Sequence, residues 1–295
     1  MRSDEYRWWK PSFAEYNRVQ SAVIPFCDKD VNLIVAAPTA VGKTTIAECS
    51  FGYHIANGQN CVYLCPFRAI ANEKERGWAK TSLASNGISV WNGDSINRNI
   101  GGLVIATLEA FDFALKSHYN DEWLKSVKCL VLDEAHILGD VSRGSVAENV
   151  LMEVSSINPE CRFILLSATM GNSKELALWV KSLNGKQTKC VNSNWRPIEV
   201  VYKIHSAHDF KSKIETTIDL IKDNPFVKTL VFVQSKKTGA VLVDKLRANG
   251  IRTVFHNASV KPGIRKKMEM EFNDPFSGLD VLISTATLGA GVNIG

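Results

Sequence analysis

Short apolar runs alternate with helical stretches along almost the whole chain, and this alternation constrains the fold more than any other feature. The runs are rich in β-branched residues. In chain order, the first seven are NLIVAA, CVYLCP, ISVWNG, GLVIAT, CLVLDE, RFILLSAT and KCVN. Amphipathic segments separate them, such as NSKELALWVKSL, which we expect Asn172 and Glu175 to start as a capping box. Continuous apolar strands separated by helices predict a parallel sheet covered on both faces.

The same rhythm restarts after NSNWRPIEV, with the apolar runs EVVYKIH, TLVFVQS, RTVFHNA and DVLISTAT. A chain of 295 residues is long enough for two domains with full cores. We therefore place a boundary near Trp195–Pro197. The predicted fold class is α/β, with a first parallel-sheet domain at 1–197 and a second at 198–295.

Composition limits the class of protein, its compartment and its partners. A hydrophobic content of 45% with 22% charged residues is ordinary for a globular protein, and no apolar run is long enough to span a bilayer. The seven cysteines are scattered, and Cys61 and Cys65 sit in an apolar run, so we expect core thiols and a reducing compartment, cytoplasm or nucleus. The net charge of +5 permits a polyanionic partner without requiring one.

The stretch AAPTAVGKTTIAE follows an apolar run and precedes an expected helix, which is the context of a phosphate-binding loop. Its backbone N–H groups would bind phosphates, assisted by the helix N-terminus. Lys43 would reach the β- and γ-phosphates of ATP, and the Thr44 hydroxyl would hold Mg²⁺. The expected nucleotide-binding residues of the loop are Ala37, Pro38, Thr39, Ala40, Val41, Gly42, Lys43 and Thr44.

Two alanines stand where such loops usually have glycine. Ala37 costs little if its position does not need a positive φ, whereas we expect Gly42 to need one. Ala40 likewise replaces a common glycine. The loop alone would also suit an enzyme that attaches isoprenyl groups to tRNA, or a small-molecule kinase.

Two further apolar runs end in residues with carboxylate or hydroxyl side chains. CLVLDEAH places Asp133 where it would bind Mg²⁺ and Glu134 where it would polarise the water that attacks the γ-phosphate. LLSATM places the hydroxyls of Ser167 and Thr169 at another strand end. Together with the loop, these segments predict ATP hydrolysis.

The motifs PTAVGKT, DEAH and SAT, in this order and at strand ends, resemble those of superfamily 2 helicases. Other segments are similar to those of the Ski-two-like group, which includes archaeal-type repair helicases and meiotic helicases. They span nearly the whole chain: YNRVQSAVIP, CPFRAIANEK, IATLEAF, SRGSVAE, NWRPIEV, TLVFVQSKKTGA, FHNA and STATLGAGVNIG.

The resemblance implies two tandem RecA-like domains, the second incomplete, and it implies roles for further residues. Gln20 would read adenine, with Tyr16 or Phe13 nearby, and Gly291 and Asn293 would face the nucleotide. The residues implied to hold the nucleic-acid strand are Arg68, Thr107, Thr285 and Thr287. Those implied to couple the two sites are His136, Ser167 and Thr169.

The resemblance therefore implies an ATP-dependent helicase that moves along single-stranded DNA, 3′ to 5′, and separates strands. DNA is favoured over RNA because the Gln20 segment and the NWRP boundary resemble the repair branch. An RNA helicase of the same group is the first alternative, and a transferase or kinase acting on tRNA or a small molecule is the second. A binding module without hydrolysis would have no use for Lys43, Asp133 and Glu134.

The segment STATLGAGVNIG ends at Gly295, where the family would continue into motif VI with an arginine that reaches the γ-phosphate. From this resemblance we expect a fragment, or one piece of a split protein, whose missing segment or a partner chain supplies that arginine. Since such an arginine is worth on the order of 10³–10⁵ in rate, we expect slow hydrolysis by this chain alone.

Overall fold

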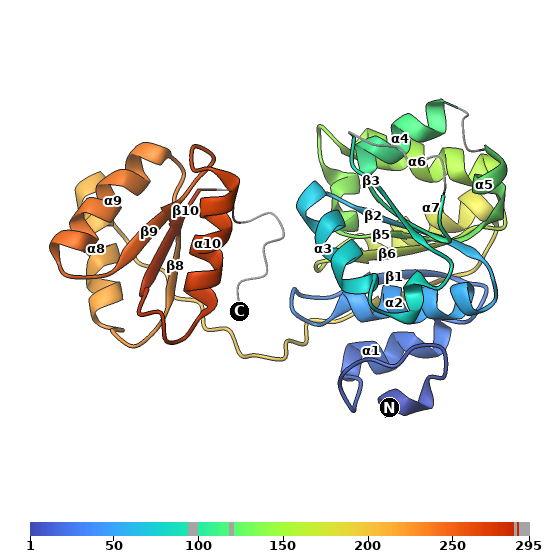
Figure 1. Ribbon diagram of the computed structural model, residues 1–295, viewed down its shortest axis with the longest axis horizontal. Coiled ribbons are helices and arrows are strands. Elements are labelled where there is room, and N and C mark those ends of the chain that lie inside the picture. Colours follow the sequence, from blue (N-terminus) through green and yellow to red (C-terminus); the bar gives the residue numbers. More distant parts are fainter. Residues whose placement is uncertain (94–99, 118–120, 286–287, 289–295) are drawn as a thin grey trace. The chain divides into compact units, whose positions relative to one another are not determined.

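The structure is a computed structural model that describes residues 1–93, 100–117, 121–285 and 288. The chain divides into two compact units, Met1–Glu199 and Val200–Gly295. Each unit contains a parallel sheet with helices on both faces (Figure 1). The predicted fold class, two parallel α/β domains in tandem with a smaller second domain, is confirmed.

Parallel strands form the sheet of the first unit, in the order β3-β4-β2-β5-β6-β1-β7. Each corresponds to one of the apolar runs that predicted it. Their bounds are β1 Asn32–Ala36, β2 Asn60–Cys65, β3 Ile88–Trp91, β4 Leu103–Thr107, β5 Val127–Leu132, β6 Arg162–Ser167 and β7 Thr188–Asn192.

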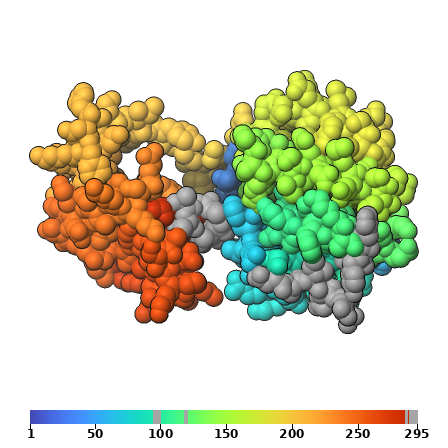
Figure 2. Space-filling model, turned by 90° about the horizontal axis from the view of Figure 1, so that it is seen from above, coloured from blue at the N-terminus to red at the C-terminus, as the bar shows by residue number. Residues whose placement is uncertain are grey.

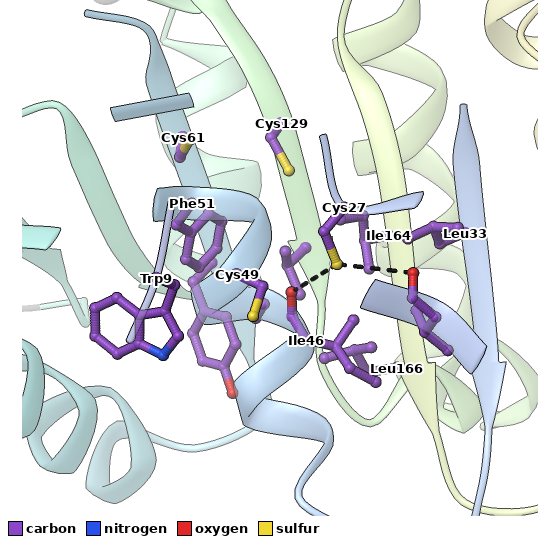
Figure 3. Packing of buried hydrophobic residues seen from close by; sticks show 14 of the residues in the cluster. Trp9, Cys27, Leu33, Ile46, Cys49, Phe51, Cys61, Cys129, Ile164 and Leu166 are labelled. Carbon is purple, nitrogen blue, oxygen red and sulfur yellow. Dashed lines mark hydrogen bonds between the residues drawn. The ribbon is translucent and has the colours of Figure 1, made fainter. Parts of the chain in front are cut away.

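Helices bury both faces of this sheet, which explains why its inner strands are apolar on both sides, whereas the edge strand β7 is largely exposed. In β1, Leu33 and Val35 join one hydrophobic cluster and Ile34 joins the other. The first cluster, part of which Figure 3 shows, also contains residues of α1 Arg18–Val23, α2 Lys43–Ala56 and α3 Arg68–Trp78. The second contains residues of α4 Leu108–Lys116, α5 Asp121–Ser126, α6 Gly144–Ile157 and α7 Ser173–Asn184. Cys61 and Cys65 are core thiols of the first cluster, as predicted.

Four short 3-10 helices complete the described elements of the first unit: η1 Ser3–Glu5, η2 Ile24–Phe26, η3 Ser82–Ala84 and η4 Ala135–Gly139. Because the strands are parallel, all of them end at one edge of the sheet. Ligands of open α/β sheets bind at this carboxyl edge. The segments that follow β1, β2, β4, β5 and β6 are the ones in which the sequence predicted functional residues.

The second unit has a three-stranded parallel sheet in the order β8-β10-β9. Its strands are β8 Thr229–Phe232, β9 Thr253–His256 and β10 Val281–Ser284. Ile218 of α8 (Phe210–Lys222) and Leu242 of α9 (Lys236–Ala248) join one cluster, whereas Phe272 of α10 (Pro262–Asn273) joins another. Within the described ranges of both units, no helix is long and apolar enough to cross a membrane.

The strand predicted at EVVYKIH is wrong. Residues 199–205 form neither helix nor strand, and the side chains of Val201 and Ile204 are 72% and 97% exposed. A strand is stable only when a neighbour satisfies its backbone hydrogen bonds, and no described strand pairs with this segment.

The capping box predicted at the start of α7 is also wrong, although the helix itself is confirmed. Asn172 is the N-cap residue, but its side chain caps no backbone N–H. Its backbone has φ −102° and ψ 22°, whereas a capping residue needs an extended backbone to aim its side chain at the first turn. Glu175 still lies in that first turn, where its charge favours the helix dipole.

Candidate nucleotide site and nucleic-acid face

Gly42 closes the loop between β1 and α2 and is the N-cap of α2, with φ +76° in the left-handed region. A Cβ atom at this position would also lie 2.6 Å from Nε2 of Gln20. The backbone angle favours glycine, and the prediction of a positive φ at Gly42 is confirmed; a Cβ atom would in addition displace the Gln20 amide.

The two alanines of the loop have different conformations. Among the described residues, only Ala40 and Glu134 combine a side chain with a positive φ, so Ala37 carries no such strain. Ala37 is buried, and its N–H donates to the carbonyl of Ser167 at 3.1 Å. The prediction that alanine costs little there is confirmed. Ala40 has φ +65°, a conformation that costs a non-glycine residue about 1–2 kcal/mol.

Lys43 folds back over the loop. Its Nζ donates to the carbonyl oxygens of Ala37 and Pro38, at 2.9 and 3.1 Å. Burial lowers the pKa of this ammonium group, and the carboxylates of Glu134 and Asp133 partly offset the shift. A partly desolvated cation is stabilised by an anion placed beside it, so the loop fits a phosphate group.

Thr44, the predicted Mg²⁺ ligand, has a neighbour that the sequence did not predict. The Nζ atom of Lys74, from α3, lies 3.4 Å from Oγ1 of Thr44, and the Lys74 side chain is only 18% exposed. A cationic group therefore already lies next to the hydroxyl oxygen. Since like charges repel, Mg²⁺ binding by Thr44 requires the Lys74 ammonium group to move away, and the role of Thr44 stays a prediction.

Asp133 follows β5 directly and is held on both carboxylate oxygens. Tyr63 of β2 donates its hydroxyl hydrogen to Oδ2, and the N–H of Glu134 donates to Oδ1 at 3.0 Å. The N–H of Asp133 donates to the carbonyl of Leu64 at 2.8 Å. These bonds fix the orientation of a carboxylate, which is the ligand type that Mg²⁺ prefers.

Glu134 has a left-handed backbone, with φ 52°, which is rare for a residue with a long side chain. Such strain is typical of functional sites. Burial raises the pKa of its carboxyl group, Asp133 raises it further, and Lys43 and His136 oppose the shift. A carboxylate with a raised pKa is a stronger base, which suits the predicted activation of water.

The predicted coupling residues lie at two strand ends. His136, in η4, lies with Nδ1 3.3 Å from Oε2 of Glu134. Ser167 ends β6; its Oγ is buried and has no hydrogen-bond partner in the described part of the chain. Thr169 is exposed two residues further on. His136 thus contacts Glu134, whereas the coupling roles of all three residues stay predictions.

Gln20 ties the start of α1 to the loop. It forms a capping box with Asn17, and its Nε2 donates to the carbonyl of Gly42 at 3.2 Å. Phe13 packs edge-on against Tyr16, and Phe13 and Thr45 line a cavity of about 870 Å³ beside α2. Gln20 and the loop residues 37–44 are not among the residues that line this cavity, so the role of Gln20 as the adenine reader stays a prediction.

Arg68 and Thr107, predicted to hold the strand from the first domain, lie in one cavity of about 780 Å³ at the carboxyl edge. They meet because β2 and β4 are neighbours, with Cys65 opposite Thr107. Arg68 is the first residue of α3, and Thr107 is the N-cap of α4. The remaining residues that line this cavity are Pro66, Phe67, Asn92, Gly93, Glu109, Ala110, Phe113 and Arg143. We call it the edge cavity.

Thr285 belongs to the second unit and directly follows β10, where its N–H donates to the carbonyl of His256 at 3.3 Å. It therefore also lies at the carboxyl edge of its own sheet. The predicted residues Thr287, Gly291 and Asn293 lie outside the described residues.

Several residues of these sites carried no prediction from the sequence, among them Tyr63, Lys74, Phe67, Phe113 and Arg143. Phe67 and Lys74 belong to CPFRAIANEK, in which only Arg68 was given a role. Phe113 interrupts the polar side of α4, and an exposed aromatic residue on an amphipathic helix is a signal that can be read from sequence.

Two family models match the chain. The model of DEAD/DEAH box helicases matches residues 17–176, and that of the helicase conserved C-terminal domain matches residues 212–295. The ATP-dependent DNA helicase Hel308 of Pyrococcus horikoshii is 29% identical over 90% of this chain. The DExH-box ATP-dependent RNA helicase DExH15, chloroplastic, of Arabidopsis thaliana is 33% identical over 60% of it. The chain covers 42% of the first relative and 15% of the second.

Solved structures of helicases share the fold. The structure of S. cerevisiae Dbp5 bound to RNA and ADP BeF3 matches 96% of this chain and 73% of that chain, with a TM-score of 0.71 and 18% identity. The DUF1998 helicase MrfA bound to DNA and AMPPNP matches 96% of this chain and 43% of that chain, with a TM-score of 0.74 and 21% identity.

Proposed function

The chain belongs to the DEAD/DEAH box helicases, within the Ski-two-like group, and we propose that it uses ATP hydrolysis to move along single-stranded DNA and separate strands. One observation carries this proposal. The loop that ends in Lys43 and the Asp133–Glu134 pair lie close enough that both carboxylates affect the pKa of the lysine. The edge cavity with Arg68 opens at the carboxyl edge of the same sheet.

The loop would bind the phosphates of ATP through its backbone N–H groups and through Lys43, with the base near Phe13 and Gln20. Thr44 and Asp133 would hold Mg²⁺, which neutralises charge on the phosphates when bound. Glu134 would take the proton of the attacking water, and its raised pKa supports this role. His136, Ser167 and Thr169 are proposed to transmit the state of this site to the strand.

Phosphate contacts would hold the nucleic acid, since they supply most of the affinity for single strands. Arg68 and Thr107 are the proposed contacts of the first unit. Thr285 is the proposed contact of the second unit.

DNA is the preferred polymer in this proposal, with 3′ to 5′ movement. The similarity to Hel308 extends over 90% of the chain, whereas that to the RNA helicase extends over 60%. The RNA helicase is nevertheless the more identical of the two where it matches, at 33% against 29%, so an RNA helicase of the same group is the second candidate. A transferase or kinase is disfavoured, because helicase models match both units.

The test is the ATPase rate of the chain with no polymer, with single-stranded DNA and with single-stranded RNA of matched length. We expect DNA to stimulate hydrolysis most, and Lys43→Ala to remove the stimulated rate. Stronger stimulation by RNA would favour the second candidate. Hydrolysis that responds to neither polymer, together with no binding of labelled DNA or RNA, would refute both.

A further inference from the structure

We propose that the edge cavity binds a nucleobase of the single strand, unstacked from its neighbours and stacked on Phe67 and Phe113. This inference rests on the proposed function, because it gives the strand a base-binding site in addition to its phosphate contacts. It assigns a role to two aromatic residues that neither the phosphate contacts nor the nucleotide site uses.

The two aromatic rings are exposed within the cavity. Phe67 is 40% exposed and Phe113 is 65% exposed, and both line the cavity. Phe111, two residues earlier on α4, is fully buried and stacks on Trp91 with ring centroids 5.8 Å apart. Two residues turn a helix by about 200°, so Phe113 points away from the core that Phe111 fills. The core therefore does not explain why position 113 is aromatic.

Arg143 holds one wall of the cavity. Its Nε donates to Oε1 of Glu109 at 2.6 Å, and its Nη2 donates to the carbonyl of Pro66 at 3.0 Å. Its guanidinium carbon lies 5.7 Å from the ring centroid of Phe67. These contacts fix Arg143 beside the Phe67 ring and pair the negative charge of Glu109. A platform that is ordered before binding loses less entropy when a base stacks on it.

Three charged side chains, Arg68, Arg143 and Glu109, line the cavity, which suits a nucleotide more than a neutral apolar ligand. Phe67, Thr107 and Arg143 are the N-cap residues of α3, α4 and α6, and all three line the cavity. Three helix N-termini thus face it, and each carries partial positive charge. Arg68 lines the rim of the same cavity. A phosphate is favoured at this rim and a base in the apolar hollow.

The dimensions agree with this occupant. A volume of about 780 Å³ lies within the range of about 300–1,000 Å³ that is usual for small-ligand sites. Stacking on an aromatic ring accepts every base, because every base has a π-face. The cavity is therefore expected to bind single strands of any sequence, which a translocating protein requires.

The test compares binding of two labelled single-stranded oligonucleotides of equal length and charge, one with bases and one abasic, by fluorescence anisotropy. We expect Phe113→Ala and Phe67→Ala each to weaken binding of the base-bearing strand about 5- to 150-fold and to leave the abasic strand unaffected. The slope of log affinity against log salt should stay that of the wild type, because no phosphate contact is lost.

Three further variants sharpen the test. Phe113→Tyr keeps an aromatic ring and should bind like the wild type, whereas Phe113→Leu keeps apolar area without a π-face and should bind like Phe113→Ala. Phe226→Ala is the matched control, since Phe226 is 99% exposed and lies in the second unit, outside the cavity. Thermal melts of all variants should match the wild type, because the substituted rings are not core residues.

Unchanged binding of the base-bearing strand by both alanine variants would overturn the inference and leave the proposed function standing. Equal losses for the base-bearing and abasic strands would also overturn it. A variant that loses binding of an apolar peptide but keeps that of DNA would assign the cavity to a protein partner instead. Failure of the wild type to bind either strand would refute the proposed function, and the base site with it.

Discussion

Replacing either loop alanine by glycine restores the glycine that related loops usually have, yet we expect the two replacements to have opposite effects on stability. Ala40 has a left-handed backbone and an exposed side chain. Ala37 lacks the positive φ, is fully buried and lies next to Ser167 of β6. The same substitution therefore relieves strain at one position and removes packing at the other.

The magnitudes follow from these surroundings. At Ala40, glycine removes a strain of about 1–2 kcal/mol and adds a backbone entropy cost of about 0.5–1 kcal/mol. The net effect is a gain of about 0.5–1 kcal/mol in the free energy of unfolding. At Ala37, glycine loses a buried methyl group worth about 0.8 kcal/mol and adds the same entropy cost, a net loss of about 1–2 kcal/mol.

Tryptophan fluorescence during thermal denaturation measures both effects in the right part of the molecule. All seven tryptophans lie between Trp8 and Trp195, within the first unit, so their emission reports the unfolding of the unit that carries the loop. For a domain of this size, about 1 kcal/mol shifts Tm by roughly 2–4 °C. We expect Tm to rise by about 1–4 °C for Ala40→Gly and to fall by about 3–7 °C for Ala37→Gly.

A third substitution in the same loop provides a reference for these shifts in Tm. Gly42→Ala places a methyl group on a left-handed backbone and against Gln20, so it should lower Tm as well. A lower Tm for Ala40→Gly than for the wild type would refute the assigned loop conformation. So would a shift of the same sign for Ala37→Gly and Ala40→Gly, because the argument depends on their different backbone angles.

Four other predictions test the sites. Lys43→Ala should weaken ATP binding about 10- to 150-fold in calorimetry, through loss of a charged contact to phosphate; unchanged affinity would remove Lys43 from the site. Glu134→Gln should bind ATP but hydrolyse it about 10²- to 10⁴-fold more slowly, and wild-type turnover would rule out a base at this position. Burial raises the pKa of the Glu134 carboxyl group above its ordinary 4.5, so the ionised carboxylate destabilises the fold. Glu134→Gln should therefore stabilise the first unit at pH 7 and lose this advantage below pH 4.5. Denaturation of both proteins at pH 7 and below pH 4.5 measures the difference. Arg68→Ala and Thr285→Ala should weaken single-strand binding across sequences while basal ATPase persists, and Arg68→Ala should flatten the salt dependence by about one phosphate contact; a loss of basal ATPase with intact binding would contradict both assignments.

The sequence predicted the positions of the strands in the first unit because the five inner strands, β4, β2, β5, β6 and β1, are buried on both faces. Continuous apolar runs have few other uses in a globular protein, so β1 to β7 were visible as runs. The sequence did not predict their order in the sheet. The meeting of Arg68 and Thr107 depends on β2 lying beside β4, which is a property of the folded sheet.

The chemistry of the nucleotide site was predictable where it depends on residues close in sequence. Gly42, Lys43 and Thr44 form one loop, and Asp133 and Glu134 are adjacent. The contacts that modify this chemistry come from other elements. Lys74 reaches Thr44 from α3, and Tyr63 reaches Asp133 from β2. No local pattern predicts such contacts, because they depend on how elements distant in sequence pack together.

The strand that was predicted at 199–205 but does not form shows the same distinction between local and distant interactions. Val200, Val201, Tyr202 and Ile204 give this segment the β-branched and aromatic residues that are common in strands. A helix satisfies its backbone hydrogen bonds within its own segment, and α8 to α10 form in the stretches between the apolar runs of the second unit. A strand needs a partner at the right place, and the pattern of one segment contains no information about that partner. Residue composition therefore predicts that a segment is able to join a sheet, and only pairing with a neighbour makes it a strand.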